Sequence, residues 1–353
     1  MCEQAVSFLH DLVAIESLSG QETAVANYLV AQMTQLGFIN TQVDVAGNAI
    51  GTRENRDSEG KITKEIVLLG HMDTVPGNIP VRIEDGILYG RGAVDAKGPL
   101  ATFVIAAAQA DLTPGTRIVV VGATEEEAAT SKGARHAVTQ YQPDFCIIGE
   151  PSGWNSVTLG YKGRILIDYE YAQPMSHTAG KTPGAAETGI AWLNALHEYI
   201  EAFNFDETRL FNKLLPSIRD IHTHSNGLTN SIHIKVGIRL PPNFELDEFE
   251  ADVKEWVGDA TIRFYGYESA FQTKRSSPLA QQFNRILLEA NTKPRFKLKT
   301  GTSDMNVVGP VWGCPIVAYG PGDSQLDHTP EEHIVLNEYQ QAIDILRTVL
   351  EEL

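Results

Sequence analysis

The fold of this chain is decided by residues 66–98, which read IVLLGHMDTVPGNIPVRIEDGILYGRGAVDAKG. The stretch opens with an apolar run, residues 66–69, of the kind that forms a buried strand of a parallel sheet. Gly70 ends the run, and His71 and Asp73 follow it. Ligands of open α/β sheets bind at the carboxyl ends of the strands, so these two side chains are expected at a functional edge.

His71 and Asp73 are two positions apart, and alternate residues of a strand point to the same side. An imidazole beside a carboxylate supplies a metal ligand together with the group that fixes its tautomer. A second carboxylate, Asp95, lies in the glycine-rich segment GRGAVDAKG (90–98), where the chain can bend back toward the same point. Ordinary polar surfaces and cores contain such pairs as well, so the interpretation depends on the other strands.

Two further apolar runs also end in acidic residues. The run RIVVVG (117–122) precedes ATEEE (123–127), and FCIIG (145–149) precedes Glu150. Between the run at 66–69 and the run at 117–122, an alanine-rich helix is predicted over residues 99–110, with Pro99 in its first turn. The pattern is typical of an α/β domain that gathers acidic and imidazole groups at one edge of its sheet.

The pattern changes after residue 163, where strands alternate apolar and polar residues. Strands are predicted over 164–171, 231–239 and 260–265, helices over 184–199 and 247–257, and a loop around His222 and His224. This β-α-β-α-β order predicts a small antiparallel sheet with helices on one face, inserted into the larger domain. Farther on, the run GTSD (301–304) is expected to form a turn and PIVAY (315–319) a last buried strand. The predicted architecture is an α/β domain with a mixed sheet, residues 1–163 and 274–353, and an inserted α+β (ferredoxin-like) domain, residues 164–273.

Composition excludes several classes of protein. The 353 residues carry a net charge of −17, and a nucleic-acid partner would require a basic face. Three scattered cysteines do not suggest a disulfide framework or a zinc ribbon. The chain has no apolar run of membrane-spanning length and no basic-then-apolar leader at its start. We therefore expect a cytoplasmic protein that binds neither membrane nor nucleic acid.

The acidic and imidazole groups suggest a site for two divalent metal ions. Two such ions close together can polarise a carbonyl group and supply hydroxide at neutral pH. The site needs a bridging carboxylate, terminal histidine and carboxylate ligands, and a free carboxylate as general base. The strand ends and the late segment DHTP (327–330) contain all of these groups: His71, Asp95, the triplet 125–127, Glu150 and His328. The mixed ligands suit zinc, with cobalt or manganese as alternatives.

Several of these runs together resemble one enzyme family. The runs GHMDTVP, GRGAVDAKGPLA, TEEE, GEPS and GTSD, followed by DHTPEEH, are similar to the M20 metallopeptidase clan. That clan contains acetylornithine deacetylases, succinyl-diaminopimelate desuccinylases, aminoacylases and carboxypeptidase G, and the similarity covers nearly the whole chain. Within the clan, SHTAGKTPGAAE and TEEEAATSKGARHA most resemble the N-acetyl-lysine deacetylases. These enzymes are also described as hydrolases that release lysine or ornithine from an amino-group carrier protein.

The resemblance implies a role for each site residue. One metal would bind His71 and Glu150, the other would bind Glu127 and His328, and Asp95 would bridge the two. Glu126 would be the catalytic carboxylate, and Asp73 would orient His71. The family usually has Asp-Glu-Glu where this chain has Glu125-Glu126-Glu127. The number of residues from the triplet to Gly133 favours an alignment in which Glu125 takes the place of the family's aspartate. An alignment of the triplet shifted by one residue remains the alternative.

The resemblance also implies residues outside the metal site. His177 resembles a histidine of the inserted domain that reaches the active site of the partner subunit, where it could donate a hydrogen bond to an oxyanion. The alternative for His177 is a loop histidine satisfied by backbone groups. Asn230 and Arg239, with Gly301 and Thr302, are assigned to substrate binding. The inserted domain would then serve as lid and dimer contact, and the protein would be a homodimer.

The function that the resemblance implies is hydrolysis of an amide on the α-amino nitrogen of lysine or ornithine, in lysine or arginine biosynthesis. The substrate would be a small acyl-amino acid or an acidic amino-group carrier protein. A broader aminoacylase or dipeptidase is the alternative among enzymes. Outside enzymes the alternative is a metal-binding or scaffold protein without catalysis, against which the glutamate pair beside the ligands argues.

Other candidate motifs have simpler explanations. Gly90-x-Gly92 is not a dinucleotide fingerprint, since the third glycine is missing at the required place. The remaining histidines considered, His222, His224, His233 and His333, are expected on solvated or structural surfaces. The alternating cations Lys293, Arg295, Lys297 and Lys299 indicate one solvated strand face. An acidic carrier or a substrate carboxylate docking there is the functional alternative.

Overall fold

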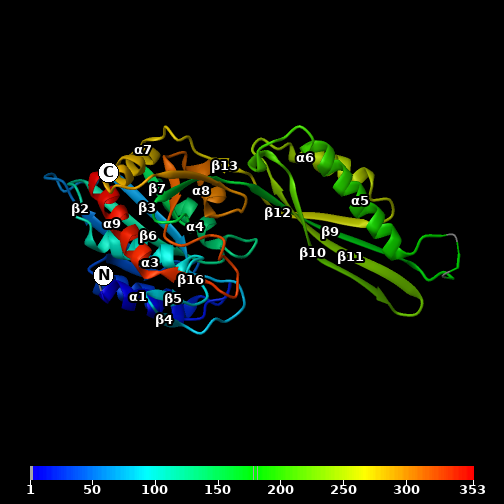
Figure 1. The fold of residues 1–353 in the computed structure, drawn as a ribbon, viewed down its shortest axis with the longest axis horizontal. Coiled ribbons are helices and arrows are strands. Elements are labelled where there is room, and N and C mark those ends of the chain that lie inside the picture. The colour runs from blue at the N-terminus through cyan, green and yellow to red at the C-terminus, as the bar shows by residue number, and fades with distance from the viewer. Residues whose placement is uncertain (1–2, 178, 181) are drawn as a thin grey trace. The chain divides into compact units, whose positions relative to one another are not determined.

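The computed structural model describes residues 3–177, 179–180 and 182–353 (Figure 1). The chain forms two compact units. The first unit comprises Met1–Gly160, Gln272–Leu298 and Ser303–Leu353, and the second comprises Tyr161–Phe271 and Lys299–Thr302. The second unit is therefore inserted in the sequence of the first. The catalytic, lid and dimer-contact roles assigned to these parts of the chain stay predictions.

A large mixed sheet forms the centre of the first unit. Its strands are β1 (Ile39–Val43), β2 (Ala49–Asn55), β3 (Lys64–His71), β6 (Thr116–Ala123), β7 (Phe145–Gly149), β8 (Ser156–Tyr161), β13 (Phe271–Gln272), β14 (Arg295–Lys299) and β15 (Ile316–Tyr319). The order is β1-β2-β6-β3-β7-β15-β8-β13, with β14 beside β8. The strands β6, β3, β7 and β15 run parallel, whereas β1, β2 and β8 pair antiparallel. This confirms the predicted mixed α/β sheet.

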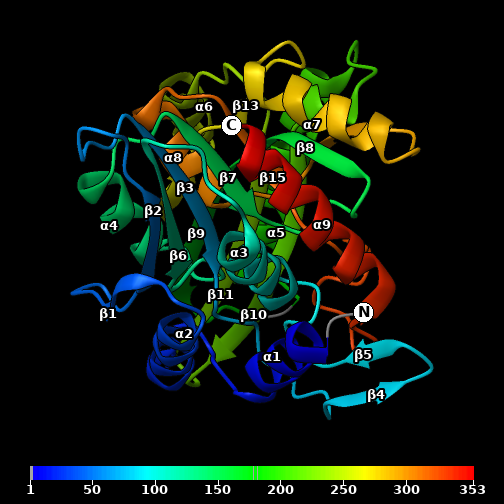
Figure 2. The same cartoon turned by 90° about the vertical axis from the view of Figure 1, so that its left-hand side faces the viewer.

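Helices cover both faces of this sheet (Figure 2). They are α1 (Glu3–Ala14), α2 (Thr23–Gln35), α3 (Lys97–Gln109), α4 (Lys132–Gln140), α7 (Pro278–Glu289), α8 (Asp304–Trp312) and α9 (Leu336–Glu352). Helix α3 packs on β3 and between α1 and α9, while α4 packs on β6 and α8. Since both faces are covered, the central strands are continuous apolar runs rather than alternating ones.

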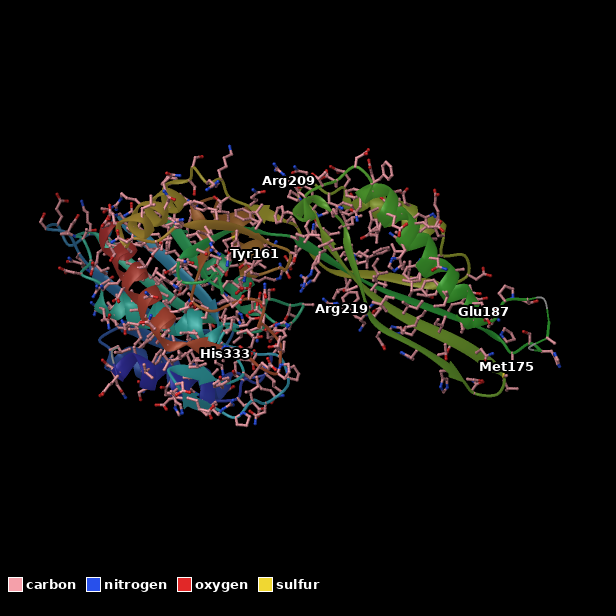
Figure 3. The ribbon with its side chains drawn as sticks, in the orientation of Figure 1. Tyr161, Met175, Glu187, Arg209, Arg219 and His333 are labelled. Carbon is pink, nitrogen blue, oxygen red and sulfur yellow. The ribbon has the colours of Figure 1, made fainter. Side chains whose placement is uncertain are left out.

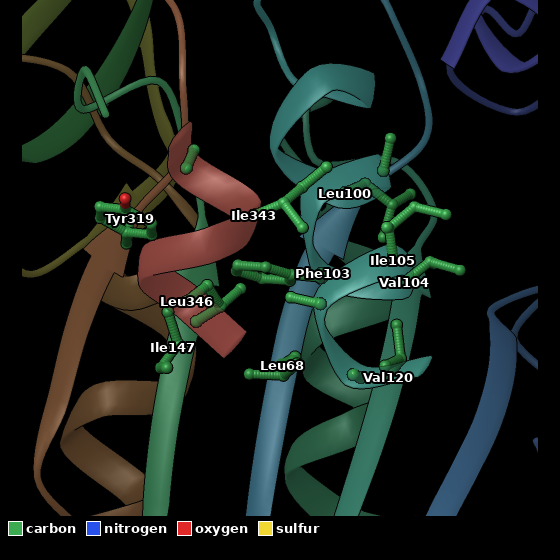
Figure 4. Close-up of a cluster of buried hydrophobic side chains, with 14 of the residues drawn as sticks. Leu68, Leu100, Phe103, Val104, Ile105, Val120, Ile147, Tyr319, Ile343 and Leu346 are labelled. Atoms are coloured by element: carbon green, nitrogen blue, oxygen red, sulfur yellow. The ribbon is translucent and has the colours of Figure 1, made fainter. Parts of the chain in front are cut away.

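Helix α3 is buried on every side over residues 97–107, as its all-round apolar sequence predicts. Figure 4 shows its Phe103 between the sheet and α9, near Leu68, Ile147 and Leu346. The alanines of α3 let it lie close to the strands. This packing holds the segment before the helix, which carries Asp95, against the end of β3.

A small sheet, which the sequence did not predict, connects the loop before residue 333 to the rest of the first unit. It consists of β4 (Arg82–Glu84), β5 (Ile87–Tyr89) and β16 (His333–Val335), in the order β16-β5-β4. His333, labelled in Figure 3, begins β16, and its ring lies 5.1 Å from that of Tyr89. The pairing brings the segment that contains His328 beside the segment that leads to Asp95.

The predicted turn at residues 301–304 is only partly right, because α8 begins at Asp304. Ser303 and Asn306 form a capping box at its start, with the Ser303 hydroxyl accepting the Met305 N–H at 3.2 Å. Gly309 and Pro310 hid this helix in the sequence, since both residues usually interrupt helices. The buried strand β8 was likewise not predicted.

The second unit is a four-stranded antiparallel sheet with the order β10-β11-β9-β12. Its elements are β9 (Gly163–Pro174), α5 (Ala185–Asn204), a 3-10 turn (Leu210–Asn212), β10 (Leu215–Ser225), β11 (Thr229–Leu240), α6 (Leu246–Glu255) and β12 (Thr261–Glu268). The order β-α-β-β-α-β is that of a ferredoxin-like unit. Its core lies between one face of the sheet and the helices α5 and α6, around Tyr169, Trp192 and Ile234. This confirms the predicted α+β fold of the inserted segment.

The predicted loop around His222 and His224 is wrong, because both residues lie in β10. This strand is at the edge of its sheet and most of it is exposed. It therefore lacks the apolar alternation from which a half-buried strand is recognised.

Within the part of the chain that the structure describes, no helix combines the length and the apolar character needed to cross a membrane.

Candidate metal centre

The centre of the candidate site is Asp95, which lies between two histidines from distant parts of the chain. Its Oδ1 is 3.2 Å from Nε2 of His71, and its Oδ2 is 3.1 Å from Nε2 of His328. Burial alone would raise the pKa of Asp95, but the contacts with His328 and His71 outweigh it and lower the pKa well below its usual value. One carboxylate thus presents one oxygen to each imidazole, as a bridging ligand would.

His71 ends β3 and is almost completely buried. Its Nδ1 lies 3.0 Å from the backbone oxygen of Asp73 and 3.4 Å from Oδ1 of the same residue. Since both neighbours are acceptors, the proton of a neutral ring resides on Nδ1 and Nε2 is left as a ligand atom. Burial lowers the pKa of His71, but its hydrogen bonds to the carboxylates of Asp73 and Asp95 outweigh this effect, so the pKa stands well above its usual value.

Asp73 connects β3 to the turn after β6. Its carboxylate accepts the Ser19 hydroxyl at 2.7 Å and the backbone N–H groups of Glu126 and Glu127 at 3.1 and 3.0 Å. Burial alone would raise the pKa of Asp73, but the bonds from His71, Ser19 and Glu127 lower it overall. The anionic form is therefore the stable one, and it holds the acidic turn in place.

The three glutamates of the turn point in different directions. Glu125 accepts the Thr130 hydroxyl at 2.7 Å and lies 3.7 Å from the Lys132 ammonium group. Glu126 places Oε2 at 4.0 Å from Nε2 of His71, and Glu127 places Oε1 at 2.9 Å from Nε2 of His328. The left-handed backbone of Glu125, with φ of +56°, makes the turn that separates these directions.

His328 comes from the loop before β16 and also has a left-handed backbone, with φ of +62°. Its side chain is 51% exposed and reaches Asp95 and Glu127. These two carboxylates raise the pKa of His328 to about 10, against a smaller opposing effect of burial. Ligand atoms of Asp95, Glu127 and His328 all lie within 4.8 Å of one another.

Negative charge accumulates around Glu126. Burial raises the pKa of its carboxyl group well above the usual value, and the charges of Glu150, Asp304 and Glu127 raise it further, although His71 lowers it. Glu150 follows β7 and is itself buried, and its charge acts on Glu126 and raises the pKa of that carboxyl group. A bound divalent cation relieves such repulsion between buried carboxylates. The mixture of imidazoles and carboxylates is also the donor set that divalent transition metals bind.

Two supporting residues were not predicted from the sequence. Glu332 is completely buried and accepts the N–H groups of Val94 and Asp95 at 2.9 and 3.1 Å, while Arg91 donates to it at 2.7 Å. Ser19 supports Asp73 in the same way. Neither has a local signal in the sequence, because each reaches its partner only through the fold.

The predicted substrate residues lie in the second unit. Nη1 of Arg239 donates to the hydroxyl of Thr302 at 2.8 Å, and Gly301 adjoins Thr302, with open space where a side chain would be. Asn230 pairs with Gln173 in the sheet. His177 is exposed, and its Nδ1 accepts the N–H of Ala179 at 3.1 Å. The structure thus brings Arg239 and Thr302 together.

The alternating cations do not share one solvated face. Lys293 and Arg295 are exposed, whereas Lys297 turns inward and donates to the backbone oxygen of Ser152 at 2.7 Å. Lys299 lies 5.8 Å from the ring centre of Tyr161.

Comparison with known proteins identifies the family. Residues 67–352 match the family described as Peptidase family M20/M25/M40. The chain is 42% identical to the "[LysW]-lysine hydrolase" of Deinococcus radiodurans, over 99% of this chain and 97% of the relative. It is 30% identical to a "[LysW]-lysine/[LysW]-ornithine hydrolase" of Saccharolobus islandicus, over 82% of this chain and 81% of the relative.

Solved structures share the fold at low identity. An M20 family metallo-carboxypeptidase from Sulfolobus solfataricus, Sso-CP2, aligns with a TM-score of 0.81 and 18% identity, over 99% of both chains. The chain therefore belongs to peptidase family M20/M25/M40 and is a metal-dependent hydrolase.

Proposed function

We propose that this hydrolase releases lysine or ornithine from an N-acylated precursor, in which the acyl group belongs to a carrier protein, as a step of lysine or arginine biosynthesis. The names of relatives such as those from Deinococcus radiodurans and Saccharolobus islandicus support the substrate class. The observation that carries the chemistry is Asp95, with one oxygen toward each of two histidines and Glu126 beside them.

Two zinc ions are the cofactor that we propose, with cobalt or manganese as alternatives. His71 and Glu150 would hold one ion, Glu127 and His328 the other, and Asp95 would bridge them. When bound, such a pair polarises the scissile carbonyl group and makes a water molecule acidic enough to attack near neutral pH. The contacts of Asp95 with both imidazoles support this assignment.

Glu126 is the proton carrier of the proposed reaction. Its carboxylate takes a proton from the attacking water and later gives it to the leaving amine nitrogen. The raised pKa of Glu126, due first to burial, supports this role because a group that accepts and returns a proton needs a pKa nearer to neutrality. Asp73 positions Glu126 by holding its backbone N–H.

His177 is the proposed donor to the oxyanion of the tetrahedral intermediate. Since its Nδ1 accepts a backbone N–H, the neutral ring carries its proton on Nε2, which is then free to donate. In a homodimer this donor would serve the partner subunit, and Asn230, Arg239, Gly301 and Thr302 would bind the polar end of the substrate. Light scattering tests the dimer independently of catalysis.

A side-by-side assay tests the function. Purified protein is given carrier-linked lysine, carrier-linked ornithine, N-acetyl-lysine and a set of dipeptides, and its metal content is measured after purification without chelator. The proposal expects the highest kcat/KM on a carrier-linked substrate. A higher value on dipeptides would instead identify a dipeptidase, and turnover independent of metal would exclude the proposed chemistry.

A further inference from the structure

We propose a second metal site in this protein, formed by Asp220, His222 and His233 on the exposed face of the second unit's sheet, and specific for a divalent transition metal such as zinc. The site is separate from the candidate centre around Asp95, since all three residues belong to β10 and β11 (labelled in Figure 1). It does not depend on the proposed function.

The register of the sheet brings the three side chains together. His222 and His233 are directly paired across β10 and β11, so their side chains lie on the same face. Asp220 is two positions before His222 and shares that face. A bulge at Arg219, labelled in Figure 3, precedes Asp220 and sets where this alternation begins. The opposite face carries Ile232 and Ile234, which are buried in the core beneath α5.

The distances match those of metal ligands. Oδ2 of Asp220 is 3.1 Å from Nδ1 of His222 and 3.6 Å from Nδ1 of His233. Metal bonds of about 2.0–2.1 Å in a tetrahedral arrangement place ligand atoms about 3.3 Å apart. The ligand atoms of the three residues lie within 4.8 Å of one another, and the imidazole ring centres are 4.9 Å apart. A small shift of the rings is enough to enclose one ion.

His233 also has the environment of a metal-bound histidine. Its Nδ1 is buried and has no hydrogen-bond partner among the residues that the structure describes. Its Nε2 lies 3.9 Å from Oδ1 of Asp168, which is itself held by Arg263 and by the Tyr265 hydroxyl at 3.3 Å. Histidines that bind a metal through one nitrogen usually direct the other toward a carboxylate, which fixes the ring orientation.

The surroundings leave room to complete the coordination. An open hollow of about 450 Å³ adjoins the two histidines, and Glu170 and Asp259 line it as well. Water or one of these carboxylates can occupy the remaining position. Imidazole ligands favour zinc, nickel or copper, whereas magnesium and calcium prefer an all-oxygen site.

The experiment measures zinc bound to the full-length protein by equilibrium dialysis against buffered Zn²⁺. Wild type is compared with Asp220→Asn, His222→Asn and His233→Asn. The matched control is His224→Asn, since His224 is exposed on the same strand but lies outside the cluster. Each of the three cluster variants is expected to bind one zinc ion per chain fewer than wild type, and His224→Asn the same number.

Two further measurements make the result specific. In a His328→Asn background, which alters only the candidate centre of the first unit, the loss caused by His222→Asn should still be one ion. On wild type alone, added Zn²⁺ should shift the imidazole NMR signals of His222 and His233 and leave that of His224 in place. Equal zinc content in wild type and the three cluster variants, or ring signals that Zn²⁺ does not move, would overturn the proposal and leave a hydrogen-bonded polar cluster.

Discussion

Asp73 accepts the backbone N–H of Glu126 at 3.1 Å, and its other oxygen accepts that of Glu127 at 3.0 Å. One buried carboxylate therefore fixes both the end of β3, through His71, and the turn that carries the acidic side chains. The geometry of the candidate centre depends on this link as much as on the ligands themselves.

Replacing Asp73 by Asn should reduce kcat/KM by about 10–100-fold, because an amide has one acceptor oxygen and would bring its NH₂ group against a backbone donor. Kinetics and metal content of the purified variant check this. Ser19→Ala removes a single hydrogen bond to the same carboxylate and should have a smaller effect. An Asp73→Asn enzyme with a wild-type rate and full metal content would show that the link is not needed.

Glu126→Gln should lose about 10²–10⁴-fold in kcat while retaining its metal, since the amide cannot carry the proton. Glu125→Gln is the matched control: its side chain points to Thr130 and Lys132, so its rate should stay close to wild type. Loss of activity in Glu125→Gln with retention in Glu126→Gln would mean that the shifted register is the right one.

Strong local patterns account for what could be predicted. The continuous apolar run of β3 and the polar residues after it identified the sheet edge, because a continuous apolar run is typical of a strand that is buried on both faces of a parallel sheet. The strand β10 could not be predicted, since its exposed residues carry no alternation, and neither could α8, since Gly309 and Pro310 lie within it. The supporting role of Glu332 arises from a contact 237 residues away in the chain, to the N–H of Asp95. No local pattern encodes such a contact.

Metal binding should be coupled to proton release. In the metal-free protein the pKa of His328 is raised to about 10, first by Asp95 and then by Glu127, and that of His71 stands well above its usual value because Asp73 and Asp95 overcome the effect of burial. Both rings are then protonated near neutral pH, but a metal ligand must be neutral, so binding should release about two protons from them. Calorimetric titration in buffers of different ionisation enthalpy measures this number.

The raised pKa of His328 also makes the stability of the metal-free protein depend on pH. A histidine whose pKa is higher in the folded state stabilises the metal-free fold fully below its unfolded value of 6.5, and this contribution is lost as the pH rises through about 10. Metal affinity should correspondingly fall as the pH is lowered. Metal binding without proton uptake by the buffer would contradict the predicted release of protons from the two histidines.

Reversing the exposed cations Lys293 and Arg295 tests whether the proposed acidic carrier protein docks on them. The chain has a net charge of −17, so an acidic partner needs a local basic contact to approach it. The double variant Lys293→Glu with Arg295→Glu should raise KM for the carrier-linked substrate on the order of tenfold, more strongly at low salt, because rim charges act on the association rate. Its turnover of N-acetyl-lysine should not change. Lys61→Glu, an exposed cation in the loop after β2, is the control, and an unchanged KM in the double variant would place the carrier elsewhere.

Glu332→Ala should destabilise the protein by about 3–5 kcal/mol, because it leaves the Arg91 guanidinium and two backbone N–H groups without their buried acceptor. Glu332→Gln keeps one acceptor oxygen and should cost less. Glu331→Ala, at the exposed neighbouring position, should change the free energy of unfolding by less than about 0.5 kcal/mol. Urea unfolding of the three variants gives these values.

Because Glu332 holds the N–H of Asp95, the Gln variant should also bind metal more weakly even where it remains folded. A stable Glu332→Ala protein with unchanged metal affinity would mean that Asp95 is positioned by the packing of α3 alone.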